Sequence, residues 1–196
     1  MKYIDSSLKK YLDELASDSP TPGGGGTSAL VAALGIALVA MVARIALKRL
    51  DPARRKSLSR TIKVLEHLKC DTEQIIDLDP KVYQEVMAAY ARLRKLGKSQ
   101  KTQADVEAAL ANSFRLQADL ALLIVMAKQM LGTVDRFVKG SIANDLVVSG
   151  ALLDGAFRGA VATARINVVY MKEGKHKRHF ELAIQKLEEK YRKVSF

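Results

Sequence analysis

Apolar side chains recur every three or four residues along most of this chain, and this spacing places them on one face of a helix. The first such stripe predicts a helix over residues 3–17 and consists of Ile4, Leu8, Leu12 and Leu15. Further helices are predicted to begin at Ala29 and to cover residues 52–77, 80–96, 103–131, 141–171 and 175–194. No segment alternates as a β-strand does. We therefore expect an all-α fold, a single-domain bundle of long antiparallel helices over residues 1–196.

Residues that commonly start or stop helices mark the limits of these segments. Asp51 followed by Pro52 is typical of an N-cap and a first-turn proline, and Asp79 followed by Pro80 repeats the signal. A glycine follows two of the predicted helices, at positions 97 and 132, as is common at C-terminal ends. The stretch after Asp51 is therefore expected to form two helices that are divided at Asp79.

One apolar segment, Ala29–Ala43, is uncharged over 15 residues. A helix of that length spans about 22 Å, which is shorter than the roughly 30 Å hydrocarbon core of a bilayer. Arg44 and Lys48 then end the run. Its many small residues favour a buried helix in the centre of the bundle or at a subunit interface, so we expect no membrane span.

A run of prolines and glycines, Pro20–Ser28, leads directly into that apolar segment. Consecutive glycines leave the backbone open to a ligand, and the first amides of a helix attract anions. Thr27 or Ser28 can supply a capping hydroxyl. The run thus predicts an anion-binding helix start, with a hinge or a close helix contact as the alternative. It is not a P-loop, because no Gly-Lys-Ser/Thr follows.

Cysteine, histidine and the first residues of the chain bear on metals and location. Cys70 is the single cysteine, so neither an intrachain disulfide nor a cysteine-based metal site is expected. His67, His176 and His179 lack further ligands nearby, and the last two lie among basic residues. We expect no metal site.

The first residues lack the apolar core of a secretory signal, which favours the cytosol.

Basic residues exceed acidic ones, giving a formal net charge of +11. They are spread over several segments, and no aromatic platform or known DNA-reading motif accompanies them. Nucleic acid is therefore not expected as a partner. A positive surface also suits a small polyanionic ligand, or serves only to keep the protein soluble.

Three polar residues next to apolar helical stretches are candidates for chemistry or binding. Asn144 and Asp145 precede a long apolar stretch, and Asp79 precedes Pro80. Each aspartate is also placed where a helix cap commonly lies, so a structural role is the alternative. Asn167 follows Asp145 by 22 residues, or about 33 Å of helix. If both residues matter, either one of them is structural or two subunits combine.

The stretch Leu15–Ala29, followed by the alanine-rich Ala32–Ala43, resembles the signature of the formiminotetrahydrofolate cyclodeaminase family. That family includes stand-alone methenyltetrahydrofolate cyclohydrolases, and its members carry Pro-x-Pro-Gly-Gly-Gly-Ser/Thr before an alanine-rich helix. Asp79 and Tyr83 match a family segment Asp-x-x-x-Tyr/Phe, and Asn144-Asp145 matches a polar residue and aspartate in a late helix. The similarity covers nearly the full chain.

The chain departs from the family pattern in two places. Relatives end the late helix with Asn-Val-x-Ile-Asn, of which Ile166-Asn167 is present here while Thr163 replaces the first asparagine. After the alanine-rich helix, relatives continue with small polar residues and a glycine, where this chain has Arg44 and Ala46. These departures leave open a different folate form, or a retained fold without catalysis.

The resemblance implies a homodimer that binds a reduced folate near subunit contacts and needs no other cofactor. The implied reaction closes a one-carbon bridge between N5 and N10 with release of ammonia from a formimino group; the alternative is hydration of a methenyl bridge. Asp145 and Asp79 are the candidates for proton transfer or for orienting ring nitrogens. Lysines or arginines would meet the tail carboxylates of the folate or its polyglutamate form. Substrate contacts are expected from Gly23, Gly24, Gly25, Gly26, Thr27, Ser28, Tyr83, Asn144 and Asn167.

Two other classes of function fit the same residues. One is a non-catalytic helical module that binds folate or nucleic acid. The other is a structural dimer in which the glycine run serves only close helix packing. An enzyme of folate one-carbon metabolism remains the leading prediction.

Overall fold

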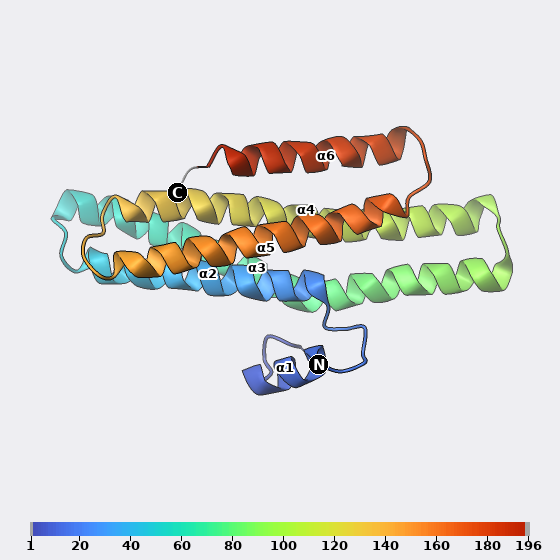
Figure 1. Ribbon diagram of the computed structural model, residues 1–196, viewed down its shortest axis with the longest axis horizontal. Helices are drawn as coiled ribbons and strands as arrows, with labels where there is room; N and C mark the ends of the chain where they lie inside the picture. Colours follow the sequence, from blue (N-terminus) through green and yellow to red (C-terminus); the bar gives the residue numbers. More distant parts are fainter. Residues whose placement is uncertain (1, 195–196) are drawn as a thin grey trace.

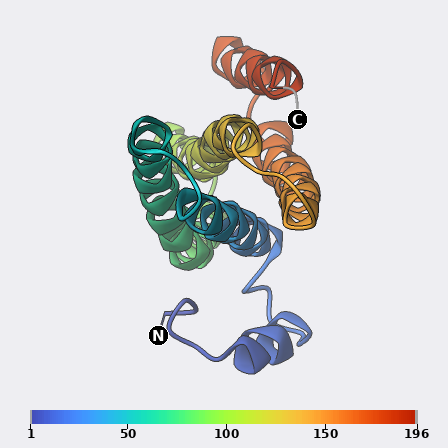
Figure 2. The same cartoon turned by 90° about the vertical axis from the view of Figure 1, so that its left-hand side faces the viewer.

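A computed structural model describes residues 2–194 and contains six helices and no strand within that range. They are α1 (Leu8–Leu15), α2 (Gly24–Leu47), α3 (Pro52–Leu96), α4 (Gln100–Asp135), α5 (Ala143–Val169) and α6 (Lys175–Arg192). Figure 1 shows α2 to α5 side by side along the long axis of the molecule. Figure 2 shows α6 against one side of this bundle and α1 at the opposite side. The predicted all-α bundle is confirmed.

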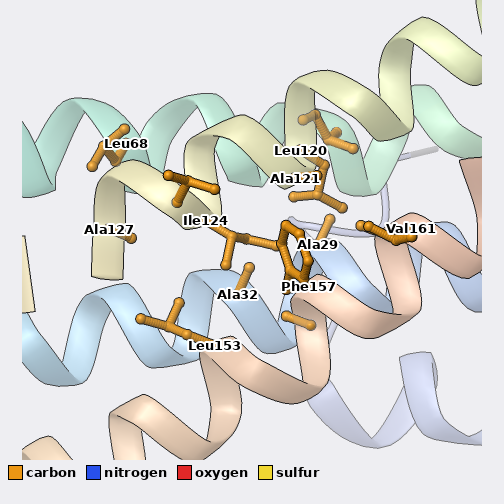
Figure 3. Close-up of a cluster of buried hydrophobic side chains, with 14 of the residues drawn as sticks. Ala29, Ala32, Leu68, Leu120, Ala121, Ile124, Ala127, Leu153, Phe157 and Val161 are labelled. Carbon is orange, nitrogen blue, oxygen red and sulfur yellow. The ribbon is translucent and has the colours of Figure 1, made fainter. Parts of the chain in front are cut away.

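The four long helices form a ring of neighbours around one core. α2 packs against α3 and α5, and α4 packs against the same two helices from the other side. Small α2 residues such as Ala29 and Ala32 face larger side chains of α4 and α5, including Ile124 and Phe157 (Figure 3). The alanines let the helix axes approach closely, which explains why the segment is rich in small residues.

The glycine run belongs to α2 rather than to a loop that precedes it. The helix begins at Gly24, and Gly23 is an N-cap that has no side chain to bond the first amides. The hydroxyls of Thr27 and Ser28 donate to the carbonyls of Gly23 and Gly24 at 2.8 and 2.7 Å. The predicted start at Ala29 and the predicted hydroxyl cap were therefore wrong, because these side chains bond backward within the first turns.

α3 is one continuous helix of 45 residues, so the predicted division at Asp79 was wrong. Pro80 lies inside the helix, where it cannot donate a hydrogen bond to the carbonyl of Ile76. That carbonyl lies 3.4 Å from the place where a Cβ on Gly26 would stand. The weak point of α3 thus faces the start of α2. The signals at Asp51-Pro52 and Gly97 mark the true ends of α3, as predicted.

Two other predicted boundaries differ from the structure. Gly132 lies within α4, which continues to Asp135, so the expected stop was wrong. α1 begins after its N-cap Ser7, and its predicted apolar stripe is largely exposed at Leu8 and Leu12. α1 instead buries Tyr11, whose hydroxyl hydrogen-bonds the Thr27 hydroxyl at 3.2 Å.

α6 is held to the bundle by a cluster of polar and aromatic side chains near its C-terminal end. The Lys128 ammonium of α4 donates to Asp154 of α5 at 2.8 Å and lies 4.3 Å from the centre of the Tyr191 ring. The Tyr191 hydroxyl of α6 also donates to Asp154, and its ring stacks on Phe157. Three helices therefore meet at one carboxylate.

α2, α4 and α5 are each long and apolar enough to cross a membrane, judged by length and composition. α2 has 24 residues and is about 36 Å long, because the glycine run and the turn around Arg44 extend the helix beyond the apolar run. Length therefore gives no reason against a membrane span for α2. The expected absence of a membrane stays a prediction.

Candidate active site

A cavity of about 500 Å³ lies at the start of α2, where α3, α4 and α5 converge on it. This volume is within the range of small-molecule sites, roughly 300 to 1,000 Å³. One carboxylate, Asp79, lies among mostly apolar and aromatic walls. The lining residues are Pro20, Thr21, Gly23, Gly24, Gly25, Asp79, Tyr83, Val86, Met87, Tyr90, Leu110, Ser113, Thr163, Ile166, Asn167 and Tyr170.

Both oxygens of Asp79 accept hydrogen bonds from the protein. The Gly26 amide of α2 donates to Oδ2 at 2.9 Å, and the Gln117 amide nitrogen of α4 donates to Oδ1 at 2.7 Å. The first-turn amides of a helix carry its positive end, so α2 does attract an anion. In the structure, the anion at the start of α2 is the side chain of Asp79. Asp79 is therefore not a helix cap in its own helix.

Gln117 is fully buried and was not predicted as a site residue. Its Nε2 bonds Asp79, while its Oε1 is buried with no hydrogen-bond partner among the described residues. Burying the unpartnered Oε1 of Gln117 costs free energy. The hydrogen bond from Nε2 to Asp79 offsets part of that cost. The only sequence signal for Gln117 is a polar residue within an otherwise apolar stretch of α4.

Gly25 has to be a glycine because Asp79 and Gln117 lie directly against its backbone. A Cβ at this position would stand 2.2 Å from Asp79 Oδ1 and 2.3 Å from Gln117 Nε2. Real Cβ atoms do not approach other atoms this closely, so any side chain would displace the pair. The neighbouring Gly24 has ordinary space, since its nearest contact would be Thr163 at 3.8 Å.

Burial raises the pKa of the Asp79 carboxyl above its ordinary value, although the hydrogen bonds from Gly26 and Gln117 act in the opposite direction. A carboxyl with a raised pKa exchanges protons closer to neutral pH than an exposed one does. Perturbed carboxyls of this kind are common at catalytic sites. Asp79 is therefore equipped to accept and return a proton, or to bind a ring nitrogen that carries one.

Three tyrosines and a short polar strip form the walls around Asp79. Tyr83 and Tyr90 come from α3, and Tyr170 lies at the C-terminal end of α5. Burial raises the pKa of the Tyr90 hydroxyl, which keeps it in the protonated, donating form. On α5, the Asn167 amide donates to the carbonyl of Thr163 at 2.9 Å. The walls suit a flat heterocycle with a few polar atoms at its edge.

The structure brings together most of the residues predicted for substrate contact. Those that line the cavity are Gly23, Gly24, Gly25, Tyr83 and Asn167, together with Asp79. Gly26 lies beneath it and holds Asp79. Thr27 and Ser28 are outside the lining, because their side chains bond backward along α2. Tyr90, Ser113 and Tyr170 were missed, since no local pattern distinguishes them from other surface or core residues.

Asn144 and Asp145 lie at the opposite end of the bundle. They begin α5, whereas the cavity is lined by residues near its C-terminal end, from Thr163 onward. The 18 residues from Asp145 to Thr163 span about 27 Å of helix. Asp145 and Asn144 therefore do not lie near Asp79 within one chain, and their role in the site stays a prediction. Their position in the first turn of α5 suits a carboxylate at a helix start.

The described lining of the cavity lacks the lysines or arginines that were expected to meet the tail carboxylates of a folate. None of the described residues that line it is a lysine, arginine or histidine, so no cation within it meets a tail carboxylate. Across residues 2–194, no three histidine, cysteine, aspartate or glutamate side chains are grouped to hold a metal ion. Of the departures from the family pattern, Thr163 lines the cavity, while Arg44 pairs with Glu66 away from it at 2.6 Å.

A model of the formiminotransferase-cyclodeaminase family matches residues 7–186 of the chain. The chain is 32% identical over 132 residues to a methenyltetrahydrofolate cyclohydrolase of Methylorubrum extorquens, which covers 61% of the chain and 64% of that relative. It is 26% identical over 197 residues to a formimidoyltransferase-cyclodeaminase of Mus musculus, which covers 92% of the chain and 34% of the relative. The chain thus spans less than two thirds of the length of either relative.

A solved structure has the same fold. It is the formiminotetrahydrofolate cyclodeaminase of Thermotoga maritima, with a TM-score of 0.84 and 20% sequence identity. The match covers 96% of this chain and 91% of that one. At this identity the likeness concerns the fold.

Proposed function

Because the chain belongs to the formiminotransferase-cyclodeaminase family, we propose that it is an enzyme of folate one-carbon metabolism. Its proposed reaction converts 5-formiminotetrahydrofolate to 5,10-methenyltetrahydrofolate with release of ammonia. The observation that carries this proposal is Asp79, a carboxyl with a raised pKa, fixed by two amides in a cavity of about 500 Å³.

The reaction needs a group that moves one proton in each direction. N10 attacks the carbon of the protonated formimino group, so that the carbon–N10 bond forms, the carbon–nitrogen double bond becomes single, and N10 loses its proton. The carbon then expels its amino group, which leaves as ammonia after gaining a proton. Asp79 can take the N10 proton and return it to the departing nitrogen. No other described carboxylate lines the cavity, which makes Asp79 the main candidate.

The walls of the cavity support a reduced folate as the ligand. The aromatic faces of Tyr83, Tyr90 and Tyr170 suit the pterin and aminobenzoyl rings, which stack on flat side chains. The apolar walls exclude water, and the exclusion strengthens the electrostatic contacts of Asp79. We also propose that the protein is a homodimer and accepts polyglutamylated folate, because exposed apolar side chains and excess positive charge need partners.

The proposal is tested by turnover with purified protein. Wild type is expected to form methenyltetrahydrofolate from the 5-formimino substrate, measured by the absorbance of the methenyl product and by ammonia release. Asp79→Asn should lower kcat about 100-fold, since one proton-transfer group typically contributes 100-fold or more. Glu85→Gln is the matched control, because Glu85 is an exposed carboxylate on α3 outside the cavity.

Absence of turnover by wild type would contradict the enzymatic proposal. Folate binding without turnover would then favour a non-catalytic module. Salt-sensitive retention of RNA without folate binding would favour the nucleic-acid alternative.

A second candidate reaction is the hydrolysis of 5,10-methenyltetrahydrofolate. It is favoured by the 32% identity to a relative named methenyltetrahydrofolate cyclohydrolase. In this reaction water adds to the methenyl carbon, and Asp79 would accept the proton that the water loses. Asp79 would then return that proton to N5 as the carbon–N5 bond breaks, and the hydroxyl proton is released as the formyl group forms. This reaction is measured by the loss of methenyl absorbance when 5,10-methenyltetrahydrofolate is the only substrate. It differs from the first reaction because it releases no ammonia.

A further inference from the structure

α1 is joined to the bundle by side chains rather than by close helix packing. Among the helices of residues 2–194, it is the one that packs against no other at close backbone distance. Figure 2 shows it standing off from the start of α2. Leu8 and Leu12 are exposed, and Tyr11 is the one buried residue of α1. The position of this helix therefore depends strongly on Tyr11.

Tyr11 begins a chain of two hydrogen bonds that ends at the backbone of α2. The Thr27 hydroxyl donates to the carbonyl of Gly23 at 2.8 Å, and the hydroxyl oxygens of Tyr11 and Thr27 are 3.2 Å apart. A hydroxyl has a single proton, so Thr27 cannot also donate to Tyr11. The Tyr11 hydroxyl is therefore the donor of the first bond. We call the two hydroxyls and the Gly23 carbonyl the Tyr11 relay.

The protonation of Tyr11 suits this direction of the relay. Burial raises the pKa of the Tyr11 hydroxyl, which keeps its proton in place. The negative charge of Asp79 acts in the same direction, so the hydroxyl lies close enough to feel the field of the carboxylate. The relay thus runs beside the candidate catalytic group.

The relay ends at a residue that lines the Asp79 cavity. Gly23 is the N-cap of α2 and has no side chain with which to bond the first amides. Its carbonyl is held twice by Thr27, by the backbone amide at 3.0 Å and by the hydroxyl at 2.8 Å. Hydrogen bonds in a chain strengthen one another, so a donor at the Thr27 hydroxyl tightens the bond to Gly23.

The segment that follows α1 forms part of the cavity wall. Pro20 and Thr21, in the connector to α2, line the Asp79 cavity. Thr21 also lines a separate hollow of about 280 Å³ between this segment and α3. A hollow provides no contacts to hold the connector from behind. The other described tie of the segment to α3 is the backbone amide of Tyr3, which donates to Asp77.

We infer that Tyr11 is a positioning residue for the Asp79 site. Its hydroxyl, acting through Thr27, fixes the carbonyl of Gly23 and holds residues 20–21 in place as a wall of the cavity. A ligand in the cavity is therefore bound more tightly when the relay is intact. The identity of this ligand as a reduced folate rests on the proposed function, whereas the relay and its effect on the backbone do not.

Three substitutions separate the relay from the shape of its side chains. Tyr11→Phe removes the first donor and keeps the ring, which lies 5.7 Å from the ring of Tyr3. Thr27→Val removes the middle hydroxyl, and Thr27→Ser retains it. Tyr3→Phe is the matched control, because the Tyr3 hydroxyl has no hydrogen-bond partner within residues 2–194. Circular dichroism checks that each variant is folded.

Binding of tetrahydrofolate measures the effect on the cavity, because this folate lacks the one-carbon group and cannot react. Tyr11→Phe and Thr27→Val should each raise its Kd about 5-fold in calorimetric titration, which is the scale of one ordinary hydrogen bond. Thr27→Ser and Tyr3→Phe should stay within about twofold of wild type. With the formimino substrate, KM should rise in the same proportion while kcat changes less than about twofold, since Tyr11 does not touch the reacting atoms.

The double variant tests whether the two hydroxyls act as one unit. Tyr11→Phe combined with Thr27→Val breaks the same relay twice, so its Kd should equal that of Thr27→Val alone. Multiplied effects of the two substitutions would show that the hydroxyls act independently and would overturn the relay.

Hydrogen exchange tests the relay in the free protein, without a ligand. Tyr11→Phe should speed exchange of the Thr27 amide, which donates to Gly23, by roughly 5-fold, while the centre of α2 is unchanged. Unchanged exchange at Thr27 would overturn the inference. Faster exchange with an unchanged Kd for tetrahydrofolate would also overturn it, because Tyr11 would then only anchor α1.

Failure of the proposed function gives a different pattern. If wild type neither binds tetrahydrofolate nor turns over a folate, the proposed function fails. The exchange of the Thr27 amide in Tyr11→Phe and Thr27→Ser still decides whether the relay fixes Gly23. The two failures are therefore distinguishable.

Discussion

The Gly26 amide donates to Asp79 rather than to open solvent, and this contact sets the character of the site. A carboxylate at the positive end of a helix is stabilised in its charged form, while burial acts against the charge. The outcome is a raised pKa that the Gly26 and Gln117 amides keep from rising further. Small changes around Asp79 should therefore shift its titration in a known direction.

Gln117→Leu is expected to move the acid limb of the pH–kcat profile to higher pH. The reaction needs ionised Asp79, and loss of the Gln117 donor removes an interaction that favours this form. The maximal kcat should fall about 10-fold because one oxygen of Asp79 is no longer fixed. Steady-state kinetics from pH 5 to pH 9 measure both effects. Gln129→Leu, an exposed position on α4, should leave the profile unchanged.

Gly25→Ala is expected to destabilise the protein by about 1 to 3 kcal/mol, because its Cβ would displace Asp79 and Gln117 from a tightly packed position. Urea unfolding followed by circular dichroism measures the change. Gly24→Ala is the matched control and should change stability by less than about 1 kcal/mol, since its Cβ has ordinary space. Equal effects of the two substitutions would contradict this account of the glycine run.

At the scale of helices, the sequence predicts those helix boundaries that capping residues in the immediate neighbourhood determine. The Asp51-Pro52 start and the Gly97 stop of α3 depend on neighbouring residues, and both were predicted. Pro80 and Gly132 remain inside helices because packing against neighbouring helices outweighs a local cost of about 1 to 3 kcal/mol. The glycine run is helical for a related reason, since Asp79 and Gln117 of other helices bond or crowd its first turn.

The docking of α6 is expected to depend on pH through Asp154. Burial alone would raise the pKa of this carboxyl, but the Lys128 and Tyr191 hydrogen bonds outweigh it and hold the pKa below its ordinary value. A lowered pKa in the folded state means that the stabilisation is complete above the ordinary aspartate pKa and is lost as pH falls through the lowered value. α6 should therefore loosen in acid before the bundle does.

Hydrogen exchange measures this loosening directly. Asp154→Asn should raise exchange in α6 at neutral pH by roughly 5- to 10-fold, which corresponds to about 1 kcal/mol. Glu181→Gln, at an exposed α6 position without a described partner, is the control. Uniform exchange changes across all helices would contradict a local role for the Asp154 cluster.

At the scale of the whole molecule, the sequence predicted several residues that gather at one cavity, but not where Asp145 lies relative to it. Gly23, Asp79, Tyr83 and Asn167 come from three helices and meet at one cavity. Helical periodicity predicts on which face of its helix a residue lies. It does not predict which residues of other helices lie at the same end of the bundle. For this reason the sequence did not show that Asp145 lies at the end of α5 away from the cavity, about 27 Å of helix from Thr163.

The net charge of +11 should speed the arrival of an anionic folate. We expect kcat/KM to fall several-fold between about 20 mM and 300 mM salt, with kcat unchanged, because salt screens the approach rather than the chemistry. Stopped-flow or initial-rate measurements over this range test it. A formimino substrate that lacks the glutamate tail should be nearly insensitive to salt, and equal sensitivity of the two substrates would contradict steering through the tail.

The ring of helix neighbours also has a consequence for how the molecule folds. Three of its four contacts, α2 with α3, α3 with α4 and α4 with α5, join helices that follow one another in the chain. Pairs of neighbouring helices close shorter loops than distant pairs do, and low contact order is typical of fast folding. Only the contact of α2 with α5 closes a long loop. The Asp79 cavity takes residues from both of these helices, so it is complete only once this long loop has closed.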